Sequence, residues 1–171
     1  MLKDKTLSAL NKQLNEELAS AYLYYSMSAY FESLNLRGFA NWMRVQALEE
    51  LTHAQKFYDH IVGRGGRVIM DSLKKPDTEW NSPTEAFAAA LEHERFITAS
   101  IDKLVTAALE ERDYATKTFL DWFVTEQVEE EAQADEVLQK VKMVEKSIGA
   151  MFVLDRDLGK RTFSNAANGG E

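Results

Sequence analysis

The sequence predicts an all-α protein, a four-helix bundle with a long crossover between its second and third helices and a short C-terminal fifth helix. Helix-breaking residues are rare, with only 2 prolines and 8 glycines in 171 residues. Apolar side chains recur at alternating spacings of three and four, which is the period of an amphipathic helix. Helix start and stop signals divide this pattern into four long segments and one short segment.

The first predicted helix runs from about Thr6 to Ser33 and stops near Asn35. Its inward stripe consists of Leu7, Leu10, Leu14, Ala21, Tyr24, Ser28 and Phe31. The second predicted helix begins near Gly38 and ends in the sequence GRGG, where glycine can adopt the left-handed cap conformation. Its inward stripe carries Phe39, Met43, Gln46, Phe57 and Ile61.

Residues 64–82 form a long connection that ends at a helix start signal. Ser82 is an N-cap residue, Pro83 suits the first helical position, and Glu85 completes a capping box. The third predicted helix begins there, and its inward residues are Phe87, Ala90, Ile97, Ile101, Leu104 and Ala108. A break near Asp113 precedes a fourth helix, whose inward residues are Leu120, Phe123, Ala134, Val137 and Val141.

These connections predict the topology of a single domain covering residues 1–171, with the bundle over about 6–143. Short turns make antiparallel helix pairs, and the long connection can cross the bundle to join the two pairs in parallel. A short fifth helix over about 147–158 is not needed by a four-helix core, so we expect it to pack elsewhere, for example against other subunits. The polar tail over about 164–171 is expected to be flexible.

Composition limits the possible chemistry and location. The absence of cysteine excludes disulfides, thiolate nucleophiles and iron–sulfur ligation, so any bound metal must have oxygen and nitrogen ligands. The formal net charge of -8 argues against nucleic-acid binding and favours the attraction of cations. No apolar run approaches the length of a membrane span, about 18 residues, and the N-terminal stretch lacks a long apolar segment. We therefore expect a cytoplasmic protein that binds neither nucleic acid nor membrane.

Polar residues interrupt the apolar stripe in all four long helices. Continuing the spacing places six polar side chains inward: Glu17, Glu50, His53, Glu94, Gln127 and Glu130. Each inward polar residue of the first two helices has a counterpart 77 positions later in the last two helices. The sequence separations between the inward polar residues of the two helices are the same in both antiparallel pairs. The six side chains should therefore converge at one level in the middle of the bundle.

The four inward carboxylates require compensating positive charge. Burying them unpaired would cost several kcal/mol each, which exceeds the net stability of a domain, about 5 to 15 kcal/mol. The lysine and arginine residues lie off these stripes, and His53 alone cannot neutralise four acids. Two divalent cations would balance the four charges. Carboxylates with one imidazole and no sulfur suit iron or manganese, with zinc as a competitor.

Other titratable residues near the six positions have less specific patterns. Tyr24 is at a core position two turns beyond Glu17, from which its hydroxyl can hydrogen-bond to a ligand of the site. His60 is expected to be a packing residue near a helix end, and His93 to point to another face. Glu126, Glu129 and Glu131 are typical of a solvated face. Glu126 nevertheless follows Glu49 by the same 77 positions, which indicates an accessory cation site beside the main one.

The sequence resembles the non-haem ferritins of bacteria and archaea over nearly its whole length. The resemblance is carried by Glu17, Glu94 and the segments YLYYSMS, NWMRVQALEELTHAQKF and TEQVEEE. It implies a ferritin-like bundle. In bacterioferritins a methionine beside the ligand glutamate binds haem, and the second half of the chain has its own Glu-x-x-His. Leu51 follows Glu50 in this sequence, and Gln127 stands where a second such motif would begin. We therefore expect neither haem nor a symmetric site.

The resemblance also assigns the metal ligands. The first iron ion would be held by Glu17, Glu50 and His53. The second would be held by Glu50, Glu94 and Glu130, with Glu50 bridging and Gln127 and Tyr24 close by. A third iron site would be formed by Glu49, Glu126, Glu129 and Glu130.

The implied function is iron storage with ferroxidase activity. Fe(II) would be oxidised by dioxygen or hydrogen peroxide and stored as ferric mineral inside a homo-oligomeric shell of two dozen subunits. A di-iron oxidase, peroxidase or electron-transfer protein that forms no storage cage is the alternative. A rubrerythrin-like protein would need cysteine ligands, and mini-ferritins place their iron site between subunits. A purely structural bundle would leave the four buried acids unexplained.

Overall fold

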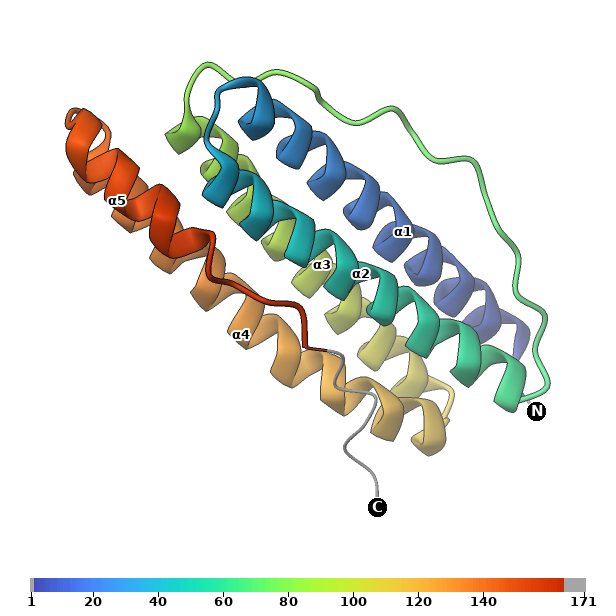
Figure 1. Cartoon of the computed structure of the whole chain (residues 1–171). Helices are drawn as coiled ribbons and strands as arrows, with labels where there is room; N and C mark the ends of the chain where they lie inside the picture. Colours follow the sequence, from blue (N-terminus) through green and yellow to red (C-terminus); the bar gives the residue numbers. More distant parts are fainter. Residues whose placement is uncertain (1, 165–171) are drawn as a thin grey trace.

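A computed structural model describes residues 2–164 of the chain. Its helices are α1 (Asp4–Ser33), α2 (Arg37–Gly63), α3 (Pro83–Glu110), α4 (Tyr114–Val144) and α5 (Ile148–Leu158). The first four lie side by side as two antiparallel hairpins, and the connection between α2 and α3 runs back along the outside of α1 (Figure 1). The predicted four-helix bundle with a long crossover and a short fifth helix is confirmed.

The two tight turns inside the hairpins each contain one residue in the left-handed region. Asn35, after α1, has φ 59°, and Arg112, after α3, has φ 54°. Asparagine tolerates this conformation better than most residues, which accounts for the helix end predicted there. Asp113 then caps α4 by accepting a hydrogen bond from the backbone N–H of Thr116 at 3.1 Å. Both turns are short, so each pair of helices is antiparallel.

The capping signal before α3 forms largely as predicted. The Ser82 hydroxyl oxygen accepts a hydrogen bond from the backbone N–H of Glu85 at 3.1 Å. The Glu85 carboxylate reaches back to the backbone N–H of Asn81 at 2.9 Å, one residue before the position expected in a capping box. Pro83 is the first residue of the helix. The end of the crossover is therefore fixed by local hydrogen bonds.

Two asparagines one turn apart on α1 bind the extended crossover. The Asn11 side-chain amide donates to the backbone oxygen of Arg67 at 3.0 Å and accepts from the backbone N–H of Ile69 at 2.6 Å. Asn15 repeats the pattern with the backbone oxygen of Ile69 at 2.9 Å and the N–H of Asp71 at 2.8 Å. These amides satisfy backbone groups that an extended segment outside a sheet leaves unpaired.

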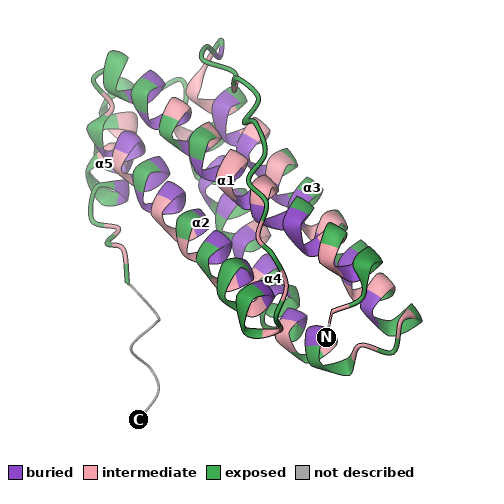
Figure 2. Cartoon of the chain, turned by 90° about the vertical axis from the view of Figure 1, so that its right-hand side faces the viewer, coloured by how far each residue is buried: buried purple, intermediate pink, exposed green. Residues whose placement is uncertain are grey.

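Buried positions recur along the inner side of the bundle helices (Figure 2). The buried apolar residues form two clusters, one toward each end of the bundle. Around the α1–α2 turn, the largest fully buried side chains are Tyr24, Met27, Phe31, Phe39, Met43 and Phe87. Toward the other end they are Leu10, Leu14, Phe57, Ile61, Ile97 and Phe123. The polar positions predicted from the sequence fall between these two sets along each helix, so apolar packing encloses the polar layer at both ends.

Helix α5 is part of the same core, which corrects the expectation that it packs elsewhere. Leu154 and Leu158, one turn apart, are buried in the cluster around the α1–α2 turn. The Asp155 carboxylate accepts hydrogen bonds from the backbone N–H groups of Gly38 at 2.7 Å and Phe39 at 3.1 Å. The N-cap residue of α2 makes no side-chain cap of its own, so α5 supplies that cap. The sequence pattern of an isolated helix could not reveal this contact.

Two further expectations from the sequence concern the C-terminal tail and membrane-spanning helices. The tail expected to be flexible, about residues 164–171, lies outside the described residues except for Ser164. Within the described part of the chain, no helix combines the length and apolar character that crossing a membrane requires.

The contact between α5 and the start of α2 predicts an unequal effect of two glycine substitutions. In Gly38→Ala the new Cβ would lie 1.6 Å from the backbone oxygen of Asp155, so α5 must move away. We expect a loss of about 2 to 4 kcal/mol in the free energy of unfolding. Gly149→Ala in α5 is the control, because its Cβ would meet no atom within 4 Å. It should leave stability unchanged or raise it by up to about 1 kcal/mol. Equal denaturant midpoints for the two variants would contradict this account.

Candidate metal centre

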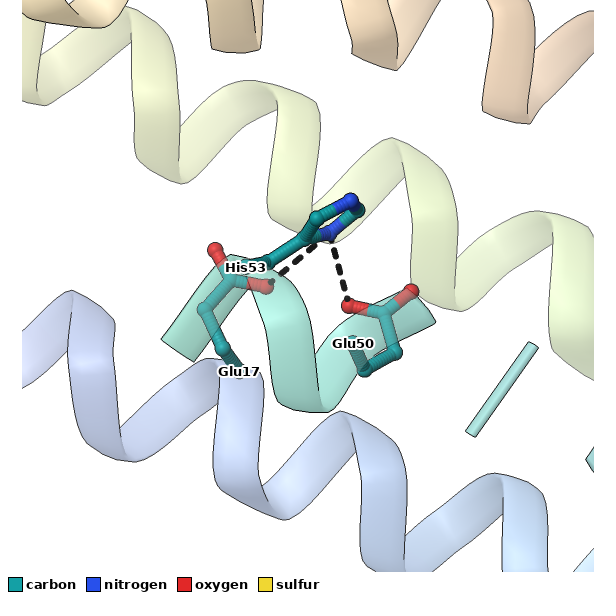
Figure 3. Close-up of side chains that lie close together, drawn as sticks. All are labelled: Glu17, Glu50 and His53. Carbon is teal, nitrogen blue, oxygen red and sulfur yellow. Dashed lines mark ion pairs between the residues drawn. The ribbon is translucent and has the colours of Figure 1, made fainter. Parts of the chain in front are cut away.

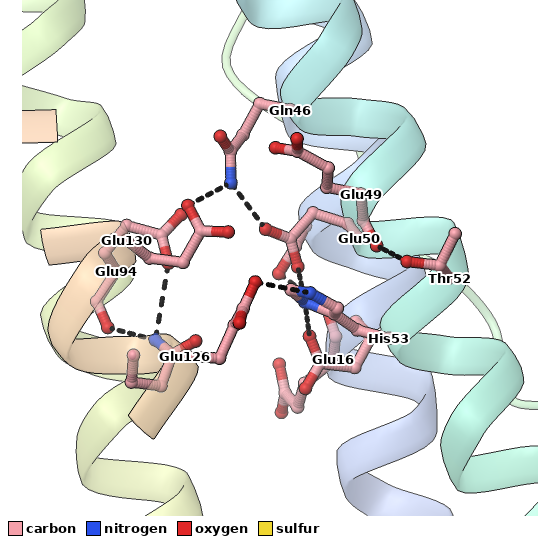
Figure 4. A network of polar contacts seen from close by, with 12 residues as sticks. Glu16, Gln46, Glu49, Glu50, Thr52, His53, Glu94, Glu126 and Glu130 are labelled. Atoms are coloured by element: carbon pink, nitrogen blue, oxygen red, sulfur yellow. Dashed lines mark hydrogen bonds and ion pairs between the residues drawn. The ribbon is translucent and has the colours of Figure 1, made fainter. Parts of the chain in front are cut away.

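All six inward polar positions are buried in the middle of the bundle. Their side chains converge from all four long helices (Figure 4). None is more than 4% exposed, and they are Glu17, Glu50, His53, Glu94, Gln127 and Glu130. Among the described residues, no lysine or arginine is buried with them. The layer therefore combines four buried carboxyl groups with a single ionisable nitrogen side chain.

The tightest group joins α1 and α2. One ligand atom from each of Glu17, Glu50 and His53 lies within 4.8 Å of the other two. His53 Nδ1 is 3.3 Å from Glu50 Oε2 and 4.0 Å from Glu17 Oε2 (Figure 3). The other Glu17 oxygen accepts a hydrogen bond from Gln13 at 2.9 Å, whereas Glu17 Oε2 is buried with no hydrogen-bond partner. A buried carboxylate oxygen without a donor is well placed to bind a cation.

A second group extends the site toward α4. Ligand atoms of His53, Glu126 and Glu130 also lie within 4.8 Å of one another, with His53 Nε2 3.9 Å from Glu126 Oε1. Gln46 connects the two groups, because its side-chain N–H atoms donate to Glu130 Oε2 at 2.7 Å and to Glu50 Oε1 at 3.1 Å. The neutral amide therefore orients two carboxylates without neutralising either one.

Glu94 belongs to neither of these groups. Its carboxylate accepts a hydrogen bond from the Tyr24 hydroxyl, and its other oxygen is 3.4 Å from the Gln127 amide nitrogen. The position of Tyr24, two turns beyond Glu17, had indicated such a hydrogen bond to a ligand of the site. The second ligand set that the resemblance implies, Glu50 with Glu94 and Glu130, is less closely gathered than the first set.

The residues expected to form a third site lie at the edge of the layer. Glu49 and Glu126 line a cavity of about 560 Å³ together with His53 and Trp122. Both carboxylates are partly buried, whereas Glu129, on the same helix as Glu126, is exposed. This group of acids therefore connects the buried layer with the surface of the bundle.

The two remaining histidines lie outside the layer, as expected. His60 stacks on Phe119 with the ring centroids 4.0 Å apart. His93 Nε2 is 2.7 Å from the Ser20 hydroxyl oxygen, and burial lowers the pKa of His93. Both rings have packing or hydrogen-bond partners of their own, so neither adds a nitrogen ligand to the layer.

Sequence reasoning missed one cation beside the site. Arg161 follows α5, and its guanidinium donates a hydrogen bond to Glu49 and another to Gln46 Oε1 at 2.9 Å. Because Arg161 lies in a non-helical segment, helical periodicity gives no signal for it. The prediction that lysine and arginine lie off the inward stripes remains correct, but this arginine reaches the edge of the layer from the C-terminal segment.

Burial dominates the electrostatics of the layer. Burial and the charge of Glu50 raise the pKa of Glu17 and of Glu94 well above the usual range, and the pKa of Glu130 to about 8. Burial alone would lower the pKa of His53, but the carboxylates of Glu50 and Glu17 raise it to about 10. Without metal the layer retains protons in place of other cations, so metal binding must release protons.

The donor set fits hard or borderline divalent metals. Carboxylate oxygens and one imidazole nitrogen, with no sulfur, suit iron and manganese and also admit zinc. The buried, unpartnered oxygen of Glu17 and the amides that orient the neighbouring carboxylates are features of a preorganised cation site.

Known proteins share both the sequence and this fold. The family model described as the ferritin-like domain matches residues 7–144. A bacterial non-heme ferritin from Bacteroides fragilis is 42% identical over 161 residues, which cover 94% of this chain and 100% of that protein. The chain belongs to the ferritin family. A further bacterial non-heme ferritin, from Staphylococcus epidermidis, is 37% identical over 164 residues, or 96% of this chain and 99% of that one.

Solved ferritin structures superpose closely on the chain. A closed form of the Archaeoglobus fulgidus ferritin, engineered by site-directed mutagenesis, has a TM-score of 0.95 and 46% identity and covers 96% of this chain and 100% of its own. The open-pore ferritin of the same archaeon has a TM-score of 0.93 and 46% identity, covering 94% and 98%. The family predicted from the sequence is confirmed.

The raised pKa values predict how the stability of this ferritin depends on pH without metal. The folded state binds more protons than the unfolded chain between pH 4.5 and about 8 at Glu130, and between pH 6.5 and about 10 at His53. The free energy of unfolding should therefore fall as pH rises through these ranges. Calorimetry of the metal-free protein should show a lower unfolding temperature at pH 8 than at pH 6.

Saturating zinc is the control for this pH dependence, because the metal replaces the retained protons. The fall in unfolding temperature between pH 6 and pH 8 should then be smaller. The substitution Glu130→Gln should also reduce the fall, since it removes one of the groups whose pKa is raised in the folded state. An unfolding temperature of the metal-free protein that increases over this range would contradict the assignment.

Proposed function

We propose that the chain is the ferroxidase subunit of an iron-storage cage. It binds two Fe(II) ions at the buried layer, oxidises them with dioxygen or hydrogen peroxide, and stores the ferric product as mineral inside a homo-oligomeric shell of two dozen subunits. The observation that carries the proposal is the convergence of four buried glutamates and one histidine, with no lysine or arginine of residues 2–164 buried in the same layer. The proposal retains the cytoplasmic location expected from the sequence.

The residues have distinct roles in this proposal. Glu17, Glu50 and His53 bind the first iron ion, which is supported by the closeness of their ligand atoms. Glu50, Glu94 and Glu130 bind the second, and Glu50 is shared between the two ions. The neutral partners orient these ligands: Gln13 for Glu17, Gln46 for Glu50 and Glu130, and Tyr24 and Gln127 for Glu94.

The chemistry follows from charge and electron balance. Two Fe(II) ions supply two electrons, which reduce one dioxygen to hydrogen peroxide with the uptake of two protons. Binding of the ions displaces protons from the layer, because burial has raised the pKa values of Glu17, Glu94 and Glu130. The carboxylates offset the greater charge of Fe(III), and the buried setting strengthens that interaction. No haem takes part in this scheme.

A third iron ion is proposed to bind at the edge of the layer, through Glu49, Glu126, Glu129 and Glu130. The cavity beside Glu49, His53 and Glu126 supports this assignment, because it gives an ion access to these acids from the surface. Such a site can bind iron that enters or leaves the two inner positions.

Exposed apolar residues support self-association into a cage. On α5, Ile148 is 92% exposed and Phe152 is 72% exposed, and Met143 at the end of α4 is 76% exposed. Apolar surface of this kind is typical of contacts between subunits. The alternative is a di-iron oxidase or peroxidase that uses the same layer without a storage cage. Particle size separates the two functions.

The central test is anaerobic loading of the metal-free protein with Fe(II), followed by air. The native protein should oxidise the iron rapidly and retain far more than three ions per chain in a large particle. Glu50→Ala removes the shared ligand, so we expect the initial oxidation rate to fall by at least about tenfold. Near-ultraviolet absorbance follows oxidation, and light scattering gives particle size.

Glu92→Ala is the matched control, because Glu92 lies on α3 near the site but its side chain is 70% exposed. It should oxidise iron at the native rate. If oxidation by the native protein stops near two ions per chain in a small oligomer, the chain is a di-iron enzyme without storage. Equal loss of rate in both variants would contradict the role of Glu50.

Gln127 should determine how readily the oxidised product leaves. Gln127 is a neutral side chain beside Glu94, so Gln127→Glu adds a carboxylate that binds Fe(III) more strongly than Fe(II). We expect several-fold slower recovery of the capacity to oxidise a second addition of two Fe(II) ions per chain. Gln139→Glu, at an exposed position of the same helix, is the control. Recovery in Gln127→Glu that is as fast as in the native protein would contradict this role.

A further inference from the structure

The segment after α5 returns along the bundle and fixes Arg161 against α2 (Figure 1). The Asn41 side-chain amide donates to the backbone oxygen of Arg161 at 2.9 Å. The guanidinium carbon lies 4.4 Å from the centre of the Trp42 ring, and the group donates to the Trp42 backbone oxygen at 3.3 Å. It also donates to Gln46 Oε1 at 2.9 Å. A stacked guanidinium with several acceptors is held more firmly than a solvent-exposed arginine.

The same guanidinium binds the carboxylate of Glu49. The two side chains form an ion pair and are only 16% and 23% exposed. A partly buried, charge-assisted hydrogen bond is stronger than a pair in full solvent. Glu49 is also one of the acids proposed to bind the third iron ion. The arginine contacts Glu49 Oε2, so a cation that is to be bound by this oxygen must compete with the guanidinium for it.

The segment that carries Arg161 also closes the cavity at this edge of the layer. Phe163 and Ser164 line the cavity together with Glu49, His53 and Glu126. Movement of the segment would therefore change both the ion pair and one wall of the cavity. The position of Arg161 is thus linked to access to the third site.

Arg161 is linked to the two inner ion positions as well. Its hydrogen bond uses the side-chain oxygen of Gln46, which directs the amide nitrogen of Gln46 toward Glu50 and Glu130. Loss of the arginine would leave that oxygen without this donor, but the two hydrogen bonds from the nitrogen could remain. The direct effect of Arg161 therefore falls on Glu49.

We propose that Arg161 is a displaceable counter-ion of the third cation site, and that a divalent ion must release it from Glu49 Oε2 before both oxygens of that carboxylate can bind the ion. The inference rests on the proposed function, since it assumes a third site outside two inner ions. Competition for the carboxylate and repulsion between the two positive charges both weaken binding at the third site. That site consequently fills after the inner positions.

The test is anaerobic calorimetric titration of the assembled, metal-free protein with Zn(II), a redox-inactive probe. In Arg161→Gln we expect the third ion to bind about tenfold more tightly, a change of about 1.4 kcal/mol, with the first two ions unaffected. Arg161→Lys retains the charge and should give an affinity close to the native one. Arg156→Gln removes the same charge from an arginine whose side chain is 66% exposed, and it should have no effect.

A double-variant comparison shows whether Arg161 acts through Glu49. In the Glu49→Gln background, adding Arg161→Gln should tighten the binding of the third ion by less than it does in the native background, because only the charge repulsion is then removed and competition for Glu49 is already absent. Hydrogen exchange gives an independent readout on the native protein. The third equivalent of Zn(II) should accelerate exchange in residues 160–164, whereas the first two equivalents should not.

The outcomes separate this inference from the proposed function. If native protein binds two Zn(II) ions and Arg161→Gln leaves the third affinity unchanged or lower, the counter-ion role is wrong and the dinuclear centre stands. If native protein fails to bind the first two ions, the proposed function fails and the inference fails with it. If Arg161→Gln does not assemble, hydrogen exchange of the native protein is the deciding measurement. Unchanged exchange in residues 160–164 on addition of the third equivalent of Zn(II) overturns the proposal.

Discussion

The burial of four carboxyl groups in one layer of a helical bundle is the constraint on which the rest of the structure depends. A buried, uncompensated charge costs several kcal/mol, a large fraction of the net stability of a domain. Apolar clusters enclose the layer at both ends and limit access of water. Gln13, Gln46 and Tyr24 orient the carboxyl groups without adding positive charge. Without metal, the raised pKa values keep protons on Glu17, Glu94 and Glu130, and divalent cations can bind by replacing these protons.

Regular helical geometry made the centre of the protein predictable from its sequence. A helix has a fixed rise per residue, so equal offsets along two antiparallel helices bring side chains to one level. All six inward polar positions are indeed buried in one layer. The hydrogen bond from Tyr24 to Glu94 follows from the same regularity, since the tyrosine lies two turns beyond Glu17. The bundle and its crossover could likewise be derived from periodicity and the lengths of the connections.

Helical periodicity did not predict two kinds of contact. Some involve segments without a helical repeat, and others join residues that are far apart in the chain. Arg161 follows the last helix, and only the folded chain brings it to Glu49. The docking of α5 depends on a glycine whose missing Cβ makes room for Asp155, and nothing in the spacing of α5 indicates that partner. The position of Glu94 outside both close ligand groups is set by side-chain hydrogen bonds, which no pattern of apolar residues specifies.

The cap that Asp155 provides for α2 also bears on how the chain folds during synthesis. Gly38 and Asp155 are separated by 117 positions, so the first helical hairpin leaves the ribosome long before its cap exists. Until then the exposed N–H groups at the start of α2 can be satisfied only by water. The start of α2 is therefore capped by a residue that is translated 117 positions after Gly38. Nascent chains stalled before residue 155 should consequently have a frayed start of α2, so completion of the first hairpin depends on the translation of α5.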